Sequence, residues 1–292
     1  MRLCSYRDGR LAERVAVVDE DRGVPASDLL PGGPRTMGEL IAGGDDGLSA
    51  IRKAADPERI RRDGRPLAEL ELLAPVPRPG KIVAIGRNYR EHAAEEGAEQ
   101  PVAPLIFAKF ASSVIGPGDD VRWDPTLTSQ VDYEAELAVI IGKRTRGVPV
   151  ERAIEFVFGY TCLNDVSARD LQFGDGQWTR GKSLDTFCPI GPVVVTADEL
   201  GDAGDLAIRC LVNGELRQSA RTSDLFFGVA QIVSHCSQSF TLEPGDVIAT
   251  GTPAGVGAFR KPPVWLADGD EMIVEIERIG RLVNRCRTEA NS

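Results

Sequence analysis

Residues 131–141 read VDYEAELAVII, and this stretch is expected to form a strand that runs into the core. Its second half is a continuous apolar run, which is typical of a buried strand. Side chains at every second position of a strand share one face, so Asp132, Glu134 and Glu136 are predicted to point the same way. Neighbouring carboxylates repel one another, and it costs free energy to remove them from water. The stretch therefore predicts either a bound cation or a position in solvent.

A divalent cation among the carboxylates is the first of these two interpretations. Hard oxygen ligands favour Mg²⁺, Mn²⁺ or Ca²⁺ over Zn²⁺ or Cu²⁺. Asp165 follows a second apolar stretch and could supply a further oxygen ligand, although an aspartate at a strand end is more often a turn former. The second interpretation is a strand edge whose carboxylates lie in water. The strand by itself leaves both interpretations open.

The composition limits the kinds of partner. The chain has 292 residues, enough for one large domain or a large domain with a small companion. Its formal net charge of −10 argues against nucleic acid or an anionic membrane as the main partner. An anionic small substrate is still allowed, because a metal ion can dominate the field inside a pocket. With 2 histidines in the chain, a His-rich zinc site is excluded.

The cysteines and the N-terminus indicate a compartment. The 6 cysteines are spread singly, with no Cys-X-X-Cys pair. The first residues lack the apolar core of a signal peptide, and no stretch approaches the roughly 20 apolar residues of a membrane span. We therefore expect reduced thiols in a cytoplasmic protein that is not attached to a membrane.

The chain is predicted to divide into a small N-terminal α+β domain (1–73) and a larger domain (74–292). The proline-rich run at 74–80 marks the boundary, because closely spaced prolines favour a stiff, extended connector. In the first domain we expect strands at 2–6 and 13–18, a turn at Asp8-Gly9, and helices near 36–41 and 48–55.

The larger domain is predicted to be rich in short strands with few helices, which indicates a mixed α+β fold. Strands are expected at 81–85, 105–110, 160–165, 190–195, 206–212, 215–219 and 272–278. Helices are expected at 87–97, 150–158 and 224–240, the last capped by Ser223 or Asp224. Residues 172–187 are predicted to be an ordered loop over a site.

Two further groups of residues are chemically competent. His92 and Glu95 are neighbours at i and i+3 of a helix, a spacing that can orient an imidazole as a general base, although a solvated acidic helix has the same spacing. Lys182 could neutralise a developing oxyanion, and the glycine-rich stretch 251–257 could offer backbone N–H groups to an anion. Both loops could equally be structural. Neither carries a nucleotide-binding fingerprint.

Five motifs in this order resemble the fumarylacetoacetate hydrolase family. They are GRNYREHAAE (86–95), VDYEAELAVIIGK (131–143), NDVSARDLQ (164–172), GKSLDTFCPIGP (181–192) and LEPGDVIATGTPAGVG (242–257). The resemblance implies a β-roll core, a homodimer, and one divalent cation, Mg²⁺ or Mn²⁺ (with Ca²⁺ a possible replacement in a crystal). It assigns the cation to Glu134, Glu136 and Asp165, and so removes Asp132 from the ligands.

The resemblance also implies roles for the other residues. His92 and Glu95 would lie on a lid helix and activate water, and Lys182 would lie near the substrate. Arg169, Gln172 and Thr252 match positions that contact substrate oxygens or support the site. Specificity is expected from the lid after Glu95 and from residues 173–179. A binding protein on an inactive enzyme fold would be expected to lack one of the key residues, and all are present.

The activity implied first is metal-dependent hydrolysis of a C–C bond in a 2,4-dioxo acid, of the acylpyruvate or fumarylpyruvate type met in aromatic catabolism. Water activated by His92 and Glu95 would attack the distal carbonyl, and an enolate would leave. The alternative is a decarboxylase or isomerase of a small 2-oxo acid, such as oxaloacetate, at the same metal site. In either case the partner is a small oxo-acid substrate.

Overall fold

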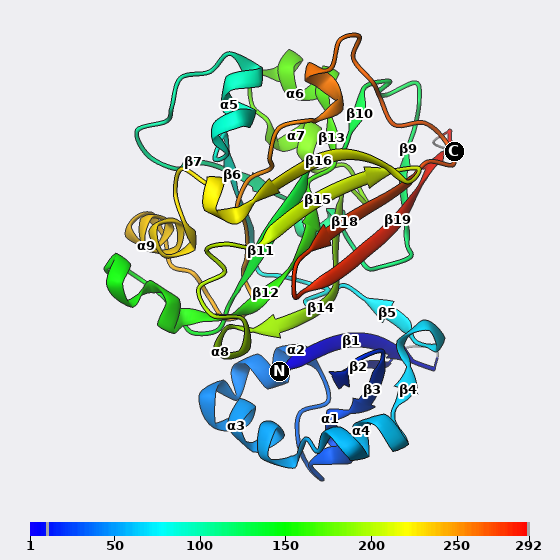
Figure 1. Cartoon of the computed structure of the whole chain (residues 1–292), viewed down its shortest axis with the longest axis vertical. Coiled ribbons are helices and arrows are strands. Elements are labelled where there is room, and N and C mark those ends of the chain that lie inside the picture. Colours follow the sequence, from blue (N-terminus) through cyan, green and yellow to red (C-terminus); the bar gives the residue numbers. More distant parts are fainter. Residues whose placement is uncertain (10–11, 291–292) are drawn as a thin grey trace.

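The computed structural model describes residues 1–9 and 12–290. Figure 1 shows the N-terminal residues, in blue and cyan, at one end of a larger part that holds the rest of the chain. The described residues combine many strands with short helices, which confirms the predicted α+β class with a β-rich core. No helix in these two ranges is long and apolar enough to cross a membrane.

The largest sheet runs through both ends of the molecule. Its strands are β1 (Arg2–Asp8), β2 (Ala12–Asp19), β3 (Arg22–Pro25), β4 (Arg65–Pro66), β5 (Glu71–Leu73), β6 (Ile82–Gly86), β7 (Leu105–Lys109), β8 (Val114–Ile115), β11 (Ala135–Ile141), β12 (Val157–Asn164), β14 (Cys188–Thr196) and β17 (Val247–Ala249). Their order is β4-β3-β2-β1-β14-β12-β11-β17-β6-β7, with β5 paired to β1 and β8 paired to β14.

A second sheet packs against the first. It contains β9 (Asp120–Trp123), β15 (Ala207–Val212), β16 (Glu215–Arg221), β18 (Glu271–Ile276) and β19 (Gly280–Thr288), in the order β16-β15-β18-β19-β9. One apolar cluster includes Leu137 of β11, Cys162 of β12 and Ile208 of β15, so it joins the two sheets. Every residue of β11 is buried, as its apolar run predicted.

The helices are short and lie around the sheets. They are α1 (Ala26–Leu29), α2 (Met37–Ala42), α3 (Gly44–Ala54), α4 (Pro57–Asp63), α5 (Arg90–Glu96), α6 (Arg169–Asp175), α7 (Thr179–Lys182), α8 (Ala197–Leu200) and α9 (Val229–Ser239), with 3-10 turns η1 (Leu67–Glu69), η2 (Ala111–Ser113), η3 (Val150–Phe156), η4 (Thr222–Asp224) and η5 (Gly257–Phe259). Figure 1 places α5, α6 and α7 together at the end opposite the N-terminal segment.

The N-terminal segment contains both helices that were predicted there, α2 and α3. It also contains α4, which was not predicted, although Asp56 caps it through the N–H of Glu58 and Pro57 begins it. The turn predicted at Asp8-Gly9 leads into residues 10 and 11, which lie outside the described residues. Strand β1 pairs with β14, with Leu3 opposite Val194, so the N-terminal segment joins the main sheet. The domain boundary between residues 73 and 74 stays a prediction.

The expectation of one continuous strand over 131–141 is wrong. A short strand β10 (Val131–Asp132) pairs with β13 (Ser167–Ala168), and β11 starts only at Ala135. Between them the N–H of Glu134 donates to the side chain of Asn164, at 2.9 Å, and not to a neighbouring strand. This side-chain partner interrupts the strand pairing between β10 and β11, and Asp132 lies outside the group formed by Glu134, Glu136 and Asp165.

The predicted loop at 172–187 is also wrong in part, because α6 and α7 cover much of it. The two helices pack closely at Gly181, where an added Cβ would lie 2.6 Å from the backbone N of Gln172. Helices this short leave little periodicity in a sequence, and they are stabilised by this tertiary packing. The prediction failed for that reason.

Two further boundaries differ from the prediction. Residues 224–240 do not form one helix from Ser223 or Asp224, since α9 begins after Gly228 and receives its cap from the side chain of Gln231. Leu225 instead forms an isolated bridge with Tyr89, which interrupts the helix pattern. The helix predicted at 150–158 is the 3-10 turn η3, and the strand at 272–278 ends at Ile276.

Candidate metal and acid–base site

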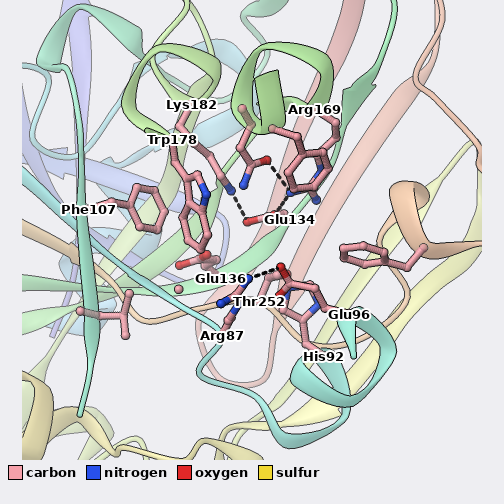
Figure 2. A pocket seen from close by; sticks show the side chains of 15 residues that line it. Arg87, His92, Glu96, Phe107, Glu134, Glu136, Arg169, Trp178, Lys182 and Thr252 are labelled. Carbon is pink, nitrogen blue, oxygen red and sulfur yellow. Dashed lines mark hydrogen bonds and ion pairs between the residues drawn. The ribbon is translucent and has the colours of Figure 1, made fainter. Parts of the chain in front are cut away.

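Most of the predicted site residues meet in one pocket between helix α5, which the resemblance predicted to be a lid, and the helices α6 and α7 (Figure 2). The empty space in and in front of the pocket, open solvent included, is about 390 Å³. Seven of the predicted residues line it, namely His92, Glu134, Glu136, Arg169, Gln172, Lys182 and Thr252. Asp165 and Glu95 do not line the pocket, but each contacts a residue that does.

Three carboxylates form the centre of the site. Glu134, Glu136 and Asp165 are buried, and each offers an oxygen within 4.8 Å of the others. Strand pairing produces this arrangement, because Ala135 of β11 lies opposite Asn164 of β12. The N–H of Asp165 donates to the carbonyl of Glu134, at 2.9 Å, and fixes the third carboxylate beside the first.

The two glutamates have opposite electrostatic environments. Burial by itself would raise the pKa of Glu134, but Lys182 and Arg169 lower it to about 2. Burial, together with the charges of Asp165 and Glu134, raises the pKa of Glu136 well above its usual range. The Glu136 carboxylate accepts a hydrogen bond from the backbone N–H of Gly251, at 2.8 Å. Among the described residues, no ion pair joins Glu136 to a basic side chain.

Lys182 lies among the carboxylates, as Figure 2 shows. Its Nζ donates to Oε2 of Glu134 at 2.7 Å and to Oδ2 of Asp165 at 2.9 Å. Burial lowers the pKa of Lys182, but Asp165 and Glu134 raise it by more, so the net pKa is raised and the ammonium keeps its charge. A buried ammonium that is paired in this way is a fixed positive charge facing the pocket.

Lys109 is a buried residue that the sequence analysis missed. Its Nζ donates to Oδ1 of Asp165 at 2.6 Å and also to the backbone carbonyl of Lys182. The two oxygens of Asp165 are therefore held by different lysines. A lysine at the end of the apolar run LIFAK was the available signal, since lysine is almost never fully buried unless it is paired.

Arg169 holds the other side of the cluster. Its Nε donates to Asp132 at 2.9 Å, and one of its amino groups lies 2.7 Å from Oε1 of Glu134. The same amino group donates to Oε1 of Gln172 at 3.0 Å. Asp132 accepts three further hydrogen bonds, from the backbone N–H groups of Tyr133, Gly257 and Ala258. Asp132 therefore fixes Arg169 and the glycine-rich loop, and it lies outside the carboxylate triad.

The lid helix α5 brings an imidazole to the pocket. Nδ1 of His92 lies 2.8 Å from Oε1 of Glu95, and Glu95 accepts from the N–H of Gly255 at 3.0 Å. Helix α5 ends at Gly97, whose φ of +72° is left-handed and suits glycine. Helix α5 is thus docked on the glycine-rich loop. The alternative of a solvated acidic helix does not hold for His92, because its side chain is buried.

The glycine-rich loop is shaped by close approach. Gly251 has a φ of +105°, and an added Cβ would lie 2.8 Å from Cβ of Asn88. The next residue, Thr252, reaches the pocket, and its Oγ1 accepts from Nε2 of Gln218 at 2.8 Å. Because that oxygen already accepts, its hydrogen is available to a ligand.

The walls of the pocket include Trp178 and Glu96, from the two segments predicted to determine specificity, and residues that the sequence analysis did not assign to the site, Arg87, Phe107 and Phe259. Phe107 and Trp178 pack edge to face, with ring centroids 5.3 Å apart, and Phe259 lies 6.0 Å from the ring of His92. Arg87 and Glu96 also line the pocket and pair with one another. Single aromatic and charged residues of this kind carry no pattern that would mark them as parts of a site.

The carboxylate triad fits a divalent cation. Glu136 is buried beside two other carboxylates, and repulsion from them opposes its ionisation. A divalent cation would remove this repulsion, and an all-oxygen ligand set is the type that Mg²⁺ or Mn²⁺ prefers. Glu134, Glu136 and Asp165 are therefore the residues that could hold the ion.

Relatives of known name cover nearly the whole chain. A mitochondrial oxaloacetate tautomerase of Bos taurus is 43% identical over 290 residues, which are 98% of this chain and 91% of that protein. An oxaloacetate tautomerase of Bacillus subtilis (strain 168) is 44% identical over 260 residues, or 86% of each protein.

Solved structures show the same fold. A fumarylacetoacetate hydrolase from the psychrophilic Exiguobacterium antarcticum has a TM-score of 0.84 and 40% identity, with 99% of this chain and 100% of that chain covered. A maleylpyruvate hydrolase from Sphingobium sp. SYK-6 has a TM-score of 0.80 and 34% identity, with the same coverage. The family model described as fumarylacetoacetate (FAA) hydrolase C-terminal matches residues 81–287. The chain therefore belongs to the fumarylacetoacetate hydrolase family, as its five motifs predicted.

Proposed function

We propose that the protein is a metal-dependent tautomerase that interconverts the enol and keto forms of oxaloacetate or of a closely related small 2-oxo acid. Relatives at 43% and 44% identity carry the name oxaloacetate tautomerase. This is the isomerase alternative of the sequence analysis. It has better support than the C–C hydrolysis that the sequence analysis placed first.

The observation that carries the proposal is a buried, oriented imidazole across the pocket from a fixed ammonium (Figure 2). Glu95 holds Nδ1 of His92, so a proton on Nδ1 leaves Nε2 free to accept one. Tautomerisation moves a proton between an oxygen and the neighbouring carbon. One group that both accepts and returns a proton can perform both halves of that exchange.

Hydrogen-bond donors are also available for the negative charge that develops on the substrate oxygen. An ammonium has three N–H donors, and Lys182 uses two of them on Glu134 and Asp165. The remaining donor can bind the substrate oxygen that becomes an enolate. The amide nitrogen of Gln172 and the hydroxyl of Thr252 can bind carboxylate oxygens, because the oxygen of each already accepts a hydrogen bond from the protein.

The metal would be held by Glu134, Glu136 and Asp165. When bound, Mg²⁺ or Mn²⁺ would supply Lewis-acid stabilisation of negative charge on the 2-oxo group. The protein groups act together with it: Lys109 and Lys182 fix the orientation of Asp165, and Arg169 fixes that of Glu134.

Hydrolysis of a 2,4-dioxo acid is the second candidate. The same His92–Glu95 pair could remove a proton from water, and one structural neighbour is named maleylpyruvate hydrolase. Hydrolysis needs a water molecule between the imidazole and the substrate, because water is a reactant, whereas tautomerisation can proceed by direct proton transfer. The docked lid and the aromatic walls of Phe107, Trp178 and Phe259 favour the direct transfer.

The two candidates can be separated by one substrate panel. Freshly dissolved enol oxaloacetate, acetylpyruvate and fumarylpyruvate would each be followed by ultraviolet absorbance with Mg²⁺ present. We expect fast loss of the oxaloacetate enol and slow or absent cleavage of the acylpyruvates. Faster cleavage of an acylpyruvate, with enol decay at the uncatalysed rate, would overturn the proposal in favour of the hydrolase.

The oligomer and the compartment stay predictions. We propose a homodimer, which size-exclusion chromatography with light scattering tests directly. We also propose a cytoplasmic location, although the Bos taurus relative is named mitochondrial. Fractionation of the source cells, with immunodetection of the protein, tests the second proposal.

A further inference from the structure

Arg87 stands at the junction of β6 and the lid, with a backbone that is unusual for its residue type. Its φ is +56°, a left-handed value that non-glycine residues adopt at some cost in free energy. The centre of its guanidinium lies 5.6 Å from the centroid of the Trp178 ring. Trp178 in turn packs so closely on Gly86 that an added Cβ would lie 2.5 Å from its Cζ3. The guanidinium is therefore held as a planar fork at the edge of the pocket.

Arg87 differs from the other cations that line this pocket in the described part of the chain. The side chains of Arg169 and Lys182 are 3% and 2% exposed, and each is held by two carboxylates. The Arg87 side chain is 36% exposed and has one carboxylate partner, Glu96. Its partner is also the least buried of the carboxylates that hold these three cations: the Glu96 side chain is 15% exposed, against 5% for Glu134 and 0% for Asp132 and Asp165, so Arg87 is the cation that changes its partner at the lowest cost.

The pair that Arg87 makes with Glu96 is bidentate. Nε and one amino group lie 2.8 Å and 2.7 Å from the two oxygens of the carboxylate. A carboxylate of a bound ligand could take the place of Glu96 on the same guanidinium, with the same bidentate geometry. Glu96 is the last residue of α5 and its side chain is 15% exposed, so displacement by a ligand would move it toward the solvent that it already contacts.

Arg87 lies at the side of the pocket where the far end of a bound 2-oxo acid would be expected. Figure 2 shows Arg87 on the side of the pocket opposite Lys182 and Arg169. A 2-oxo acid whose keto and carboxylate groups lie near Lys182 would extend its far end away from that cluster. Without Arg87, a second carboxylate there would face Glu96, and the other lysine and arginine among the described residues that line the pocket, Lys182 and Arg169, already pair with buried carboxylates.

We propose that Arg87 binds the distal carboxylate of a dicarboxylic 2-oxo acid, in exchange for Glu96, and so selects diacids over monoacids. The proposal rests on the proposed function and names the substrate class of the same site. Arg87 is a specificity residue in this account, because the reacting atoms lie at the other end of the substrate.

The test uses two stable ligands that differ in the distal group. 2-Oxoglutarate and 2-oxopentanoate have the same chain length, and 2-oxoglutarate alone carries a second carboxylate. Their dissociation constants would be measured by calorimetry with Mn²⁺ present, and kcat/KM would be measured with oxaloacetate. Arg87→Met removes the charge and keeps an apolar stem against Trp178. Arg90→Met is the matched control, because Arg90 follows closely in the chain, as the first residue of α5, but stacks on Phe226, at 5.1 Å, outside the pocket.

We expect Arg87→Met to weaken 2-oxoglutarate about tenfold or more, the usual effect of losing a charged hydrogen bond, and to lower kcat/KM for oxaloacetate by a similar factor. Binding of 2-oxopentanoate should stay within about twofold, and Arg90→Met should change neither ligand. Glu96→Gln supplies a second variant: it removes the competing carboxylate and should tighten 2-oxoglutarate alone.

Three results would overturn the proposal: equal weakening of both ligands in Arg87→Met, no weakening of 2-oxoglutarate, or a wild-type protein with no preference for the diacid. Failure of the proposed function looks different. If the protein prefers 2-oxoglutarate through Arg87 but does not accelerate enol decay, the role of Arg87 stands and the proposed tautomerase activity is wrong. If Arg87→Met changes neither ligand binding nor turnover in an active tautomerase, the proposed function stands and the role of Arg87 is wrong.

Discussion

Nδ1 of His92 lies 2.8 Å from Oε1 of Glu95, and both residues lie on a lid whose Glu95 is held in turn by the N–H of Gly255. A carboxylate on one ring nitrogen fixes the tautomer and the orientation of the imidazole. The Glu95 carboxylate therefore both holds helix α5 on the glycine-rich loop and orients the imidazole of His92.

Replacing His92 tests its role as the proton carrier. His92→Gln should lower kcat for oxaloacetate tautomerisation by about 10² to 10⁴, the range expected for loss of a general acid or base, and should leave Mn²⁺ affinity unchanged. Steady-state enol decay and Mn²⁺ titration by electron paramagnetic resonance provide the two readouts. His235→Gln, on helix α9 outside the pocket, is the matched control and should behave as wild type. Normal turnover by His92→Gln would contradict the assignment.

Lys109 is predicted to be needed for folding as well as for the site. Lys109→Met removes the ammonium from Oδ1 of Asp165 and leaves a buried carboxylate with less compensation. We expect a loss of about 3 to 5 kcal/mol in the free energy of unfolding, measured by urea denaturation of the metal-free protein. Lys143→Met, which removes a surface pair with Asp45, should cost less than about 1 kcal/mol. Similar losses for the two variants would show that the buried pair has no special weight.

Because the pKa of Glu136 is raised, the affinity of the site for a metal ion should depend on pH. In the metal-free protein the carboxyl holds its proton above the usual carboxyl range, because of burial and the charges of Asp165 and Glu134. The folded state then binds more protons than the unfolded state, so this group contributes stability that is lost as pH rises through its raised pKa. A metal must displace the proton, so its affinity should fall as pH falls.

Calorimetry with Mn²⁺ in two buffers of different ionisation enthalpy measures that proton release directly. Wild-type protein should release a proton, and Glu136→Gln should release less and bind Mn²⁺ more weakly. Equal heats in the two buffers for the wild type would contradict a protonated Glu136.

Gly86 is predicted to determine where Trp178 lies. In Gly86→Ala the new methyl group would lie 2.5 Å from Cζ3 of Trp178, so the indole must move. We expect a change in tryptophan fluorescence and a loss of roughly tenfold in kcat/KM, since a small displacement of a pocket wall can cost this much. Gly174→Ala is the control, because nothing lies within 4 Å of its added Cβ. A variant with unchanged fluorescence and activity would show that the wall can adapt.

Much of the site could be predicted because its residues belong to strands and to co-linear motifs. Glu134 and Glu136 precede a buried apolar run, and Asp165 follows another, so alternation and length place all three near one sheet. The pairing of Ala135 with Asn164, which brings Asp165 to the glutamates, is a tertiary fact that the alternation itself does not contain.

What could not be predicted depends on side chains that meet only in the fold. The break at Tyr133 and Glu134 depends on the Asn164 side chain, which is distant in sequence. Lys109 and Arg87 are ordinary residues until Asp165 and Trp178 lie beside them. Helices α6 and α7 are too short to show a period, so no pattern in the sequence marks them.

The central claim is that a divalent ion on the carboxylate triad is needed for tautomerisation of oxaloacetate. The direct measurement is the rate of enol decay by protein treated with EDTA, before and after addition of Mg²⁺ or Mn²⁺, for wild type and for Asp165→Asn. We predict that the treated wild type is inactive, that either ion restores it, and that neither ion restores Asp165→Asn. Full activity of the treated wild type, or enol decay that the metal-loaded protein does not accelerate, would contradict the account.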